Sequence, residues 1–194
     1  MLLAVPVSLA QYAAFTASGI VFFYFLVRAF SRRAPEAGAK SDRRSRAGII
    51  IQSIGIALVG FGPVRPTLSS VSVAGLAGTA GVLLLMAGAI LLFATSSREL
   101  GRNWSLVARM RSDHELVRTG SYARVRHPIY LGMLLFLLAL AVALGHYLQL
   151  VVAIPVFLIG TAIRTRLEDG LLEQQFGEAF RNYRSSTPAL IPKL

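Results

Sequence analysis

Residues 73–95, VAGLAGTAGVLLLMAGAILLFAT, decide the fold class, because this run contains no Lys, Arg, Asp or Glu. A helix that crosses a bilayer needs about 17–25 predominantly apolar residues. Helices buried in a small soluble protein would instead carry polar faces at helical spacing. Four further runs have the required length and also lack charge: Leu9–Val27, Gly48–Val64, Ile129–Gly145 and Tyr147–Ile163. We therefore predict an all-α integral membrane protein with five transmembrane helices.

The composition of the whole chain agrees with a membrane protein. Of its 194 residues, 55% are hydrophobic and 15% are charged, whereas about a quarter of the residues in soluble domains are charged. The chain has no cysteine, which excludes disulfides, thiolate metal sites and cysteine nucleophiles. A net charge of +11 would suggest a nucleic-acid partner for a soluble protein. The positions of the charges along the chain therefore have to distinguish a nucleic-acid-binding protein from a membrane protein.

The basic residues cluster in alternate connections between the predicted spans. Seven lie within 28–46, seven within 98–126 and five from Arg164 onward, while the other connections hold only Arg65. Basic loops stay in the cytoplasm, so we predict an outside N-terminus and a cytoplasmic C-terminus. The N-terminus lacks the basic region of a cleaved signal peptide, which favours a retained first span. This explanation of the charge argues against nucleic acid, and spans without ionisable residues argue against a transporter.

We predict two parts of the chain on either side of residue 97. Residues 1–97 comprise three transmembrane helices with a basic cytoplasmic linker at 28–47. The catalytic region, 98–194, comprises a cytoplasmic connector (98–128), a helical hairpin (129–163) and a C-terminal amphipathic helix and tail (164–194). Apolar residues at three-and-four spacing indicate the amphipathic helix: Leu167, Leu171, Leu172, Phe176, Ala179, Phe180 and Tyr183. Because both ends of the hairpin lie on one side, connector and tail should form one site.

Residues that can bind ligands or take part in catalysis are concentrated in the connector. Thr119-Gly120-Ser121 predicts a turn, and Pro128 suits the first turn of the fourth span. The free N–H groups of that helix start favour a polar or anionic ligand group. Taken singly, Trp104 fits an interfacial anchor and His127 fits a solvated residue. Their proximity to other polar and aromatic residues indicates a site instead.

In the C-terminal segment, Arg164 and Glu168 are the candidate ligand-binding pair. They stand at the predicted cytoplasmic mouth of the fifth span, although an ordinary i,i+4 ion pair has the same spacing. Glu173 and Glu178 fit a solvated acidic face. The three histidines, His114, His127 and His146, do not suggest a metal site, because His146 falls on the opposite side of the membrane.

A set of short motifs extends over about Gly101–Pro192. It comprises Asn103-Trp104, His114-x-Leu-Val117, Gly120-x-Tyr122, Arg126-His-Pro-x-Tyr-x-Gly132, Glu168-x-x-Leu171, Phe176-Gly177 and Tyr183. This set resembles the isoprenylcysteine carboxyl methyltransferase family and is similar to the related phospholipid methyltransferases of membranes. Asp169 stands where many members have a second Glu, and Phe180 replaces a frequent Tyr.

The resemblance implies a membrane enzyme that uses S-adenosylmethionine, releases S-adenosylhomocysteine and lacks the soluble methyltransferase fold. Arg164 and Glu168 would be catalytic, with Arg164 facing the carboxylate of a prenylated cysteine or similar lipid-like acceptor. That acceptor would be reached from the bilayer at the cytoplasmic face, in a prokaryotic cell membrane or a eukaryotic endoplasmic reticulum. By position, the cofactor would be bound by His114, Glu115, Leu116, Val117, Tyr122, His127, Pro128, Ile129, Tyr130 and Glu168.

Three alternatives remain open on the sequence. A phospholipid amine N-methyltransferase would use the same cofactor, but its acceptor needs a base, for which Glu168 or His127 is available. A nicotinamide-dependent membrane reductase is suggested by sterol reductases with a similar His-Pro region. A membrane scaffold without activity would leave the polar segment Arg98–Tyr130 unexplained.

Overall fold

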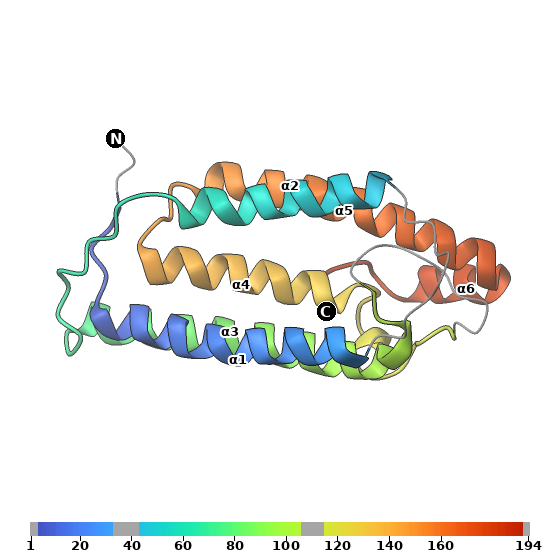
Figure 1. Cartoon of the computed structure of the whole chain (residues 1–194), viewed down its shortest axis with the longest axis horizontal. Coiled ribbons are helices and arrows are strands. Elements are labelled where there is room, and N and C mark those ends of the chain that lie inside the picture. The colour runs from blue at the N-terminus through green and yellow to red at the C-terminus, as the bar shows by residue number, and fades with distance from the viewer. Residues whose placement is uncertain (1–3, 33–42, 106–114, 192–194) are drawn as a thin grey trace.

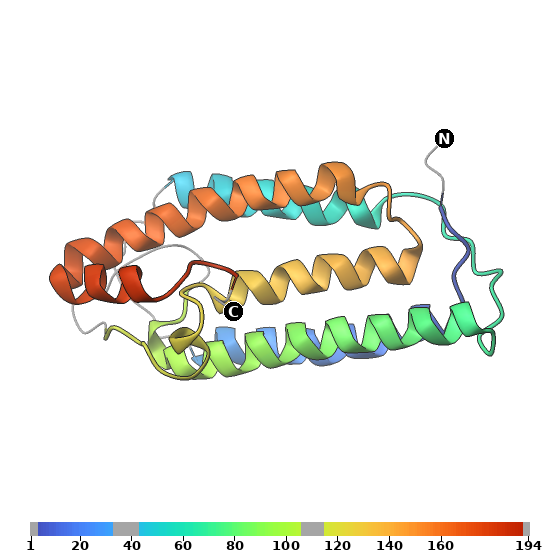
Figure 2. The same ribbon diagram turned by 180° about the vertical axis from the view of Figure 1, so that it is seen from behind.

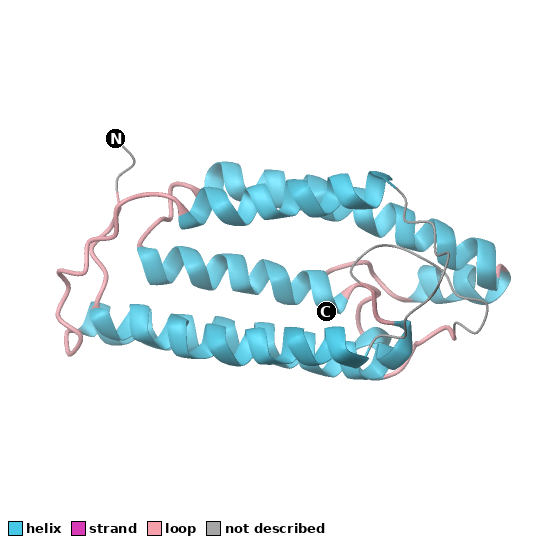
Figure 3. Ribbon diagram, in the orientation of Figure 1, coloured by secondary structure: helices cyan, strands magenta, loops and turns pink. Residues whose placement is uncertain are grey.

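The computed structural model describes residues 4–32, 43–105 and 115–191, whose helices form an elongated bundle (Figures 1 and 3). The described part of the chain contains no strand beyond an isolated bridge between Ser8 and Leu68. The predicted all-α fold is therefore confirmed. In chain order the elements are α1 (Leu9–Arg32), α2 (Arg43–Gly60), α3 (Val73–Leu100), η1 (Gly101–Asn103), η2 (Gly120–Ala123), α4 (Pro128–Leu144), α5 (Leu150–Phe176) and α6 (Glu178–Ser186).

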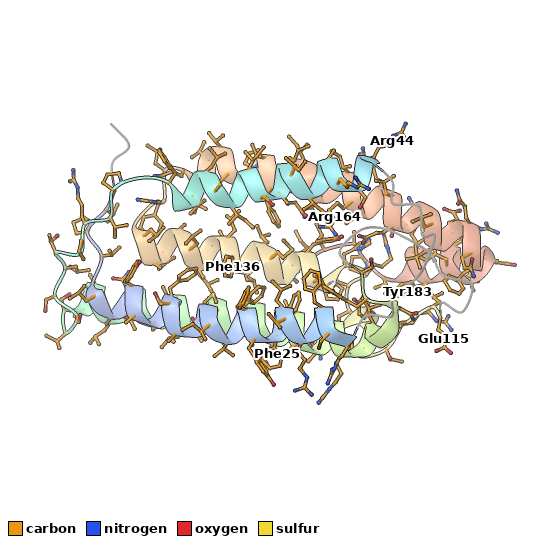
Figure 4. The ribbon with its side chains drawn as sticks, in the orientation of Figure 1. Phe25, Arg44, Glu115, Phe136, Arg164 and Tyr183 are labelled. Atoms are coloured by element: carbon orange, nitrogen blue, oxygen red, sulfur yellow. The ribbon has the colours of Figure 1, made fainter. Side chains whose placement is uncertain are left out.

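Helix α4 is the centre of the bundle. α2 packs along α5 on one side of it, and α1 packs along α3 on the other, as the front and back views show (Figures 1 and 2). Leu137 of α4 is buried with Phe157 of α5, and Ala139 is buried with Met86 of α3. Phe136 points from α4 toward α1 (Figure 4). Both faces of α4 are thus covered by apolar side chains.

Glycines bring α2 and α5 unusually close together. A Cβ on Gly160 would lie 2.7 Å from the backbone nitrogen of Gln52 and 2.8 Å from the carbonyl oxygen of Gly48. One on Gly55 would lie 3.0 Å from the carbonyl oxygen of Ala153. Small residues permit such backbone approach between membrane helices. Side chains of α2 consequently reach the part of α5 that carries the candidate site.

The five predicted apolar runs lie mainly in helices. By length and composition, α1, α3 and α5 are long and apolar enough to cross a membrane. α4 is apolar but has 17 residues. α2 has arginines at its start and ends at Gly60, so the predicted residues up to Val64 are not helical. The connection between α4 and α5 also extends to Gln149, after a turn in which Gly145 has φ +72°.

Two further helix boundaries differ from the prediction. α5 continues past Ile163 to Phe176, and Gly177, with φ +51°, turns the chain into α6. The predicted amphipathic helix is therefore the end of α5 followed by a separate short helix. α2 begins at Arg43, so the predicted linker 28–47 is helical at both ends. The uninterrupted α5 carries Arg164 and Glu168 as an extension of the fifth apolar run.

The connections predicted to be basic lie together at one end of the bundle, which we call the basic end (Figure 1). It includes the end of α1, the start of α2, residues 98–105 and 115–127, and residues 177–191. The opposite end holds the remaining connections. There, the backbone N–H of Val5 donates to the Gly145 carbonyl at 2.9 Å, and that of Val7 donates to the Arg65 carbonyl at 2.9 Å.

Candidate functional site

A cavity of about 320 Å³ lies at the basic end of the bundle. Its volume is typical of a site for a small molecule. One part of its wall is apolar, with Phe22, Leu26, Ile49, Phe93 and Met133 among its residues. The other part is polar and includes Asn103, Glu115, Tyr122, Arg126, His127, Arg164, Glu168 and Tyr183. The two parts together suit a ligand with a polar and an apolar portion.

His127 lies immediately before α4 and is buried between two carboxylates. Its Nε2 is 3.0 Å from Oδ1 of Asp169, and its Nδ1 is 3.4 Å from Oε2 of Glu168. Burial lowers the pKa of His127, but the hydrogen bonds to Asp169 and Glu168 and their negative charges outweigh it, so the pKa is raised above 6.5. The surroundings therefore favour the protonated imidazolium.

Asp169 also binds Arg126, whose Nη2 is 3.0 Å from Oδ2 of the carboxylate. The backbone N–H groups of Arg126 and His127 donate to the carbonyls of Pro188 and Ala189 at 2.9 and 3.0 Å. The segment before α4 is thus held from two sides, by α5 and by the chain that follows α6. This arrangement fixes the position of His127 at the cavity wall.

Glu168 lies between Tyr130 and Arg164. The Tyr130 hydroxyl donates to Oε1 of Glu168, and Nη2 of Arg164 is 3.9 Å from the same oxygen. The guanidinium of Arg164 lies over the Tyr130 ring, 4.9 Å from its centroid. Its Nη1 donates to Oε1 of Gln52 at 3.0 Å. Figure 4 shows Arg164 at the same end of the bundle as Tyr183, whose hydroxyl donates to the Tyr122 carbonyl at 2.6 Å.

Most of the predicted site residues meet at this cavity. Its described lining does not include Pro128, which is buried at the start of α4. His114 lies outside the described residues. Trp104 and His127 are 4% and 6% exposed, so neither is solvated or free to anchor the chain at an interface. The predicted residues that line the cavity are Glu115, Leu116, Val117, Tyr122, His127, Ile129, Tyr130, Arg164 and Glu168.

The sequence alone does not reveal the contributions of Asp169 and Gln52. Asp169 differs from the Glu of many family members, and it binds both Arg126 and His127. Gln52 lies in an apolar run outside the motif set. A lone amide in such a run is the signal that could have revealed it, because a polar side chain inside a membrane helix needs a partner on another helix.

Comparison with known proteins identifies the family of the chain. A model of the phospholipid methyltransferase family matches residues 76–179. The chain belongs to this family. The matched region covers most of α3, all of α4 and α5, and the connector that carries His127, whereas α1 and α2 lie outside it.

Three curated relatives show the range of this similarity. Protein-S-isoprenylcysteine O-methyltransferase of Schizosaccharomyces pombe is 33% identical over 96 residues, which are 48% of this chain and 41% of that protein. Cobalt-zinc-cadmium resistance protein CzcN of Cupriavidus metallidurans is 35% identical over 114 residues, 58% and 50% of the two chains. Methanethiol S-methyltransferase of Pseudomonas deceptionensis is 36% identical over 74 residues, 38% and 27%. The chain thus spans half or less of the length of these relatives.

Proposed function

We propose that this chain is a membrane methyltransferase that uses S-adenosylmethionine and methylates the carboxylate of a prenylated cysteine or a similar lipid-like acceptor. The observation that carries the proposal is a buried arginine, Arg164, at the wall of a cavity with one polar and one apolar part. The similarity to an isoprenylcysteine O-methyltransferase supports the same acceptor.

The residues around the cavity fit S-adenosylmethionine. The carboxylate of Glu168 and the aromatic rings of Tyr122 and Tyr130 suit its cationic groups. Nε of Arg126 is buried and has no hydrogen-bond partner among the described residues, which leaves a donor for a ligand carboxylate. We assign the cofactor to the predicted set, from His114 to Tyr130, with Glu168. When bound, it supplies an activated methyl group for in-line displacement.

Arg164 would bind the acceptor carboxylate through paired N–H donors, which hold one oxygen in a defined direction. A carboxylate is already ionised, so its methylation needs no general base. Orientation and exclusion of water are then the main contributions of the protein. Phe22, Leu26 and Ile49 line the apolar part of the cavity and would contact the lipid portion.

Amine methylation of a phospholipid is the second candidate, and the description of the family supports it. This reaction must remove a proton from the amine. His127 is poorly suited to accept it, because Asp169 and Glu168 favour its protonated form. Glu168 already receives a hydrogen bond from Tyr130. The surroundings of both groups therefore favour a carboxylate acceptor.

The placement in the membrane belongs to the same proposal. We propose five spans, with the basic end in the cytoplasm and the N-terminus outside, in a prokaryotic cell membrane or a eukaryotic endoplasmic reticulum. The catalytic part would be 98–194, and 1–97 would complete the bundle. Clustering of the basic connections at one end of the bundle supports this orientation.

Calorimetric binding of S-adenosylhomocysteine to the purified protein in mild detergent tests the class of enzyme. We expect saturable one-site binding that Glu168→Ala abolishes. Glu173→Ala is the matched control, because Glu173 lies on the same helix but pairs with Arg181 and Arg184 at the surface. Absence of binding by folded wild-type protein would contradict both methyltransferase proposals.

Transfer of a labelled methyl group then tests the acceptor. N-acetyl-S-farnesylcysteine and phosphatidylethanolamine are offered separately with labelled S-adenosylmethionine. We expect methylation of the farnesylcysteine and its loss in Arg164→Ala. Methylation of phosphatidylethanolamine alone would establish the second candidate.

A further inference from the structure

We infer that Gln52 of α2 is a positioning residue that holds Arg164 in the orientation needed for the acceptor carboxylate. The inference rests on the proposed function, in which Arg164 binds that carboxylate. Gln52 lies outside residues 76–179, which match the family model. Helix α2 would thus take part in acceptor binding as well as complete the bundle.

A directed chain of hydrogen bonds fixes the amide of Gln52. The Thr161 hydroxyl donates its single proton to the Phe157 carbonyl at 2.9 Å. Its oxygen can therefore only accept from Gln52, whose Nε2 is 2.8 Å away. This contact assigns the nitrogen of the amide to Thr161 and its oxygen to Nη1 of Arg164, at 3.0 Å.

The chain of hydrogen bonds is buried between α2 and α5. Gln52 and Thr161 are each 1% exposed, and Arg164 is 4% exposed. A hydrogen bond is stronger in such a site than in water. The stem of Arg164 is also confined, because a Cβ on Gly48 of α2 would lie 2.5 Å from its Cγ. Helix α2 therefore restrains both the stem and the guanidinium of this arginine.

An amide is suited to this role because it carries no charge. The Gln52 oxygen orients the guanidinium through Nη1 and adds no negative charge to the one that Glu168 already places 3.9 Å from Nη2. A carboxylate at the same position would form a buried ion pair with Arg164. It would then compete with the carboxylate of the acceptor, although its size and its contact with Nη1 would be nearly the same.

Ligand binding read from Trp104 tests the inference without turnover. Trp104 is the single tryptophan and lines the cavity. The probes are N-acetyl-S-farnesylcysteine and its methyl ester, which differ in the charge that Arg164 would recognise. The measured quantity is the ratio of the two dissociation constants in mild detergent. We expect the wild type to prefer the acid and Arg164→Ala to lose the preference.

We expect Gln52→Leu to reduce the acid preference about tenfold, as for the loss of a hydrogen bond to a charged group. Gln52→Glu should reduce it as well, and this nearly isosteric variant retains a partner for Arg164 if the leucine variant fails to fold. In the Arg164→Ala background neither substitution should change the ratio further. Gln149→Leu is the matched control, since this buried glutamine lies about 22 Å from Arg164 along the axis of α5.

Two results would overturn the inference, and they are distinguishable. A wild type that prefers the acid, together with Gln52→Leu and Gln52→Glu variants that keep its full preference, refutes the positioning role alone. A folded wild type without any preference refutes the carboxylate-binding role of Arg164, and the role of Gln52 fails with it. Reduced preference in both variants but not in Gln149→Leu supports the inference.

Discussion

At the scale of single residues, Asp169 connects the parts of the site that come from different segments of the chain. Its two oxygens bind Arg126 and His127 at 3.0 Å each, next to Glu168 on the same helix. A carboxylate that serves two cationic partners is more than a surface charge, because removal of a partner from a buried pair leaves an uncompensated charge. Asp169 therefore affects both the stability of the site and the protonation of His127.

Asp169→Asn should lower the free energy of unfolding by about 3 kcal/mol, because Arg126, whose side chain is 10% exposed, loses its anion. Chemical unfolding in detergent, followed by Trp104 fluorescence, measures the change. The control is Glu173→Gln on the same helix, which weakens exposed ion pairs with Arg181 and Arg184 and should change stability by less than about 1 kcal/mol. Equal losses in the two variants would contradict the role of Asp169.

His127 should make stability depend on pH with a definite sign. Burial lowers its pKa, but Asp169 and Glu168 raise it by a larger amount, so the folded-state pKa exceeds the ordinary value of 6.5. The stability gained is complete below that ordinary value and is lost as pH rises through the folded-state pKa. We expect the thermal midpoint to fall as pH increases above 6.5, and His127→Gln to flatten this decline. An unchanged profile in the variant would refute the assignment.

At the scale of elements, the contact between α2 and α5 sets the geometry of the polar end of the cavity. Gly48, Gly55 and Gly160 let the two backbones approach until added Cβ atoms would lie within about 3 Å of the opposite helix. Gln52 and Arg164 face one another as a result. The prediction of five separate apolar runs contains no information on this pairing, because small residues are common in membrane helices generally.

Gly160→Ala should separate α2 from α5 and lower the free energy of unfolding by about 1–3 kcal/mol, because its Cβ would meet backbone atoms that cannot move aside. It should also weaken the acid preference read from Trp104. Gly170→Ala on the same helix is the control, since its Cβ would have no atom within 4 Å. Alanine there should stabilise the helix by about 0.5–1 kcal/mol. Equal tolerance of both alanines would contradict close packing at Gly160.

At the scale of the whole molecule, α4 divides the bundle into two helix pairs, and the cavity lies where residues from both pairs meet at the basic end (Figure 1). The connections at the opposite end bond to one another through Val5, Val7 and Leu68. The cavity thus lies at the end opposite to these bonded connections, which fits the proposed methyltransferase, whose cofactor would come from water and whose acceptor would come from lipid. This arrangement also makes sidedness directly testable.

Single cysteines can report the sidedness, because the chain has none of its own. Val71→Cys lies in the connection between α2 and α3 and Ser185→Cys lies on α6, and both native side chains are exposed. We expect a membrane-impermeant maleimide to label Val71→Cys in intact cells, and Ser185→Cys only after the membrane is opened. Labelling of both from one side would contradict the five-span topology.

Much of the fold could be predicted from the sequence because its causes act along the chain. Apolar runs of membrane length form helices wherever they occur, and the placement of basic residues marks the connections that lie together. The turn at Gly120 and the start of α4 at Pro128 also follow from local preferences. The ends of the helices were harder to predict, since α5 continues to Phe176 through polar residues that no longer resemble a span.

The site likewise contains residues that the sequence identifies and residues that only the packing brings into it. Short motifs identified Tyr122, His127, Tyr130, Arg164 and Glu168 as a group, and the structure brings them to one cavity. The contact of Gln52 with Arg164, 112 positions apart, depends on how two helices pack and on the glycines between them. Asp169 likewise acquires its partners only when α5 meets the connector. Run length and charge specify which segments become helices, whereas the close packing of side chains decides which residues share a site.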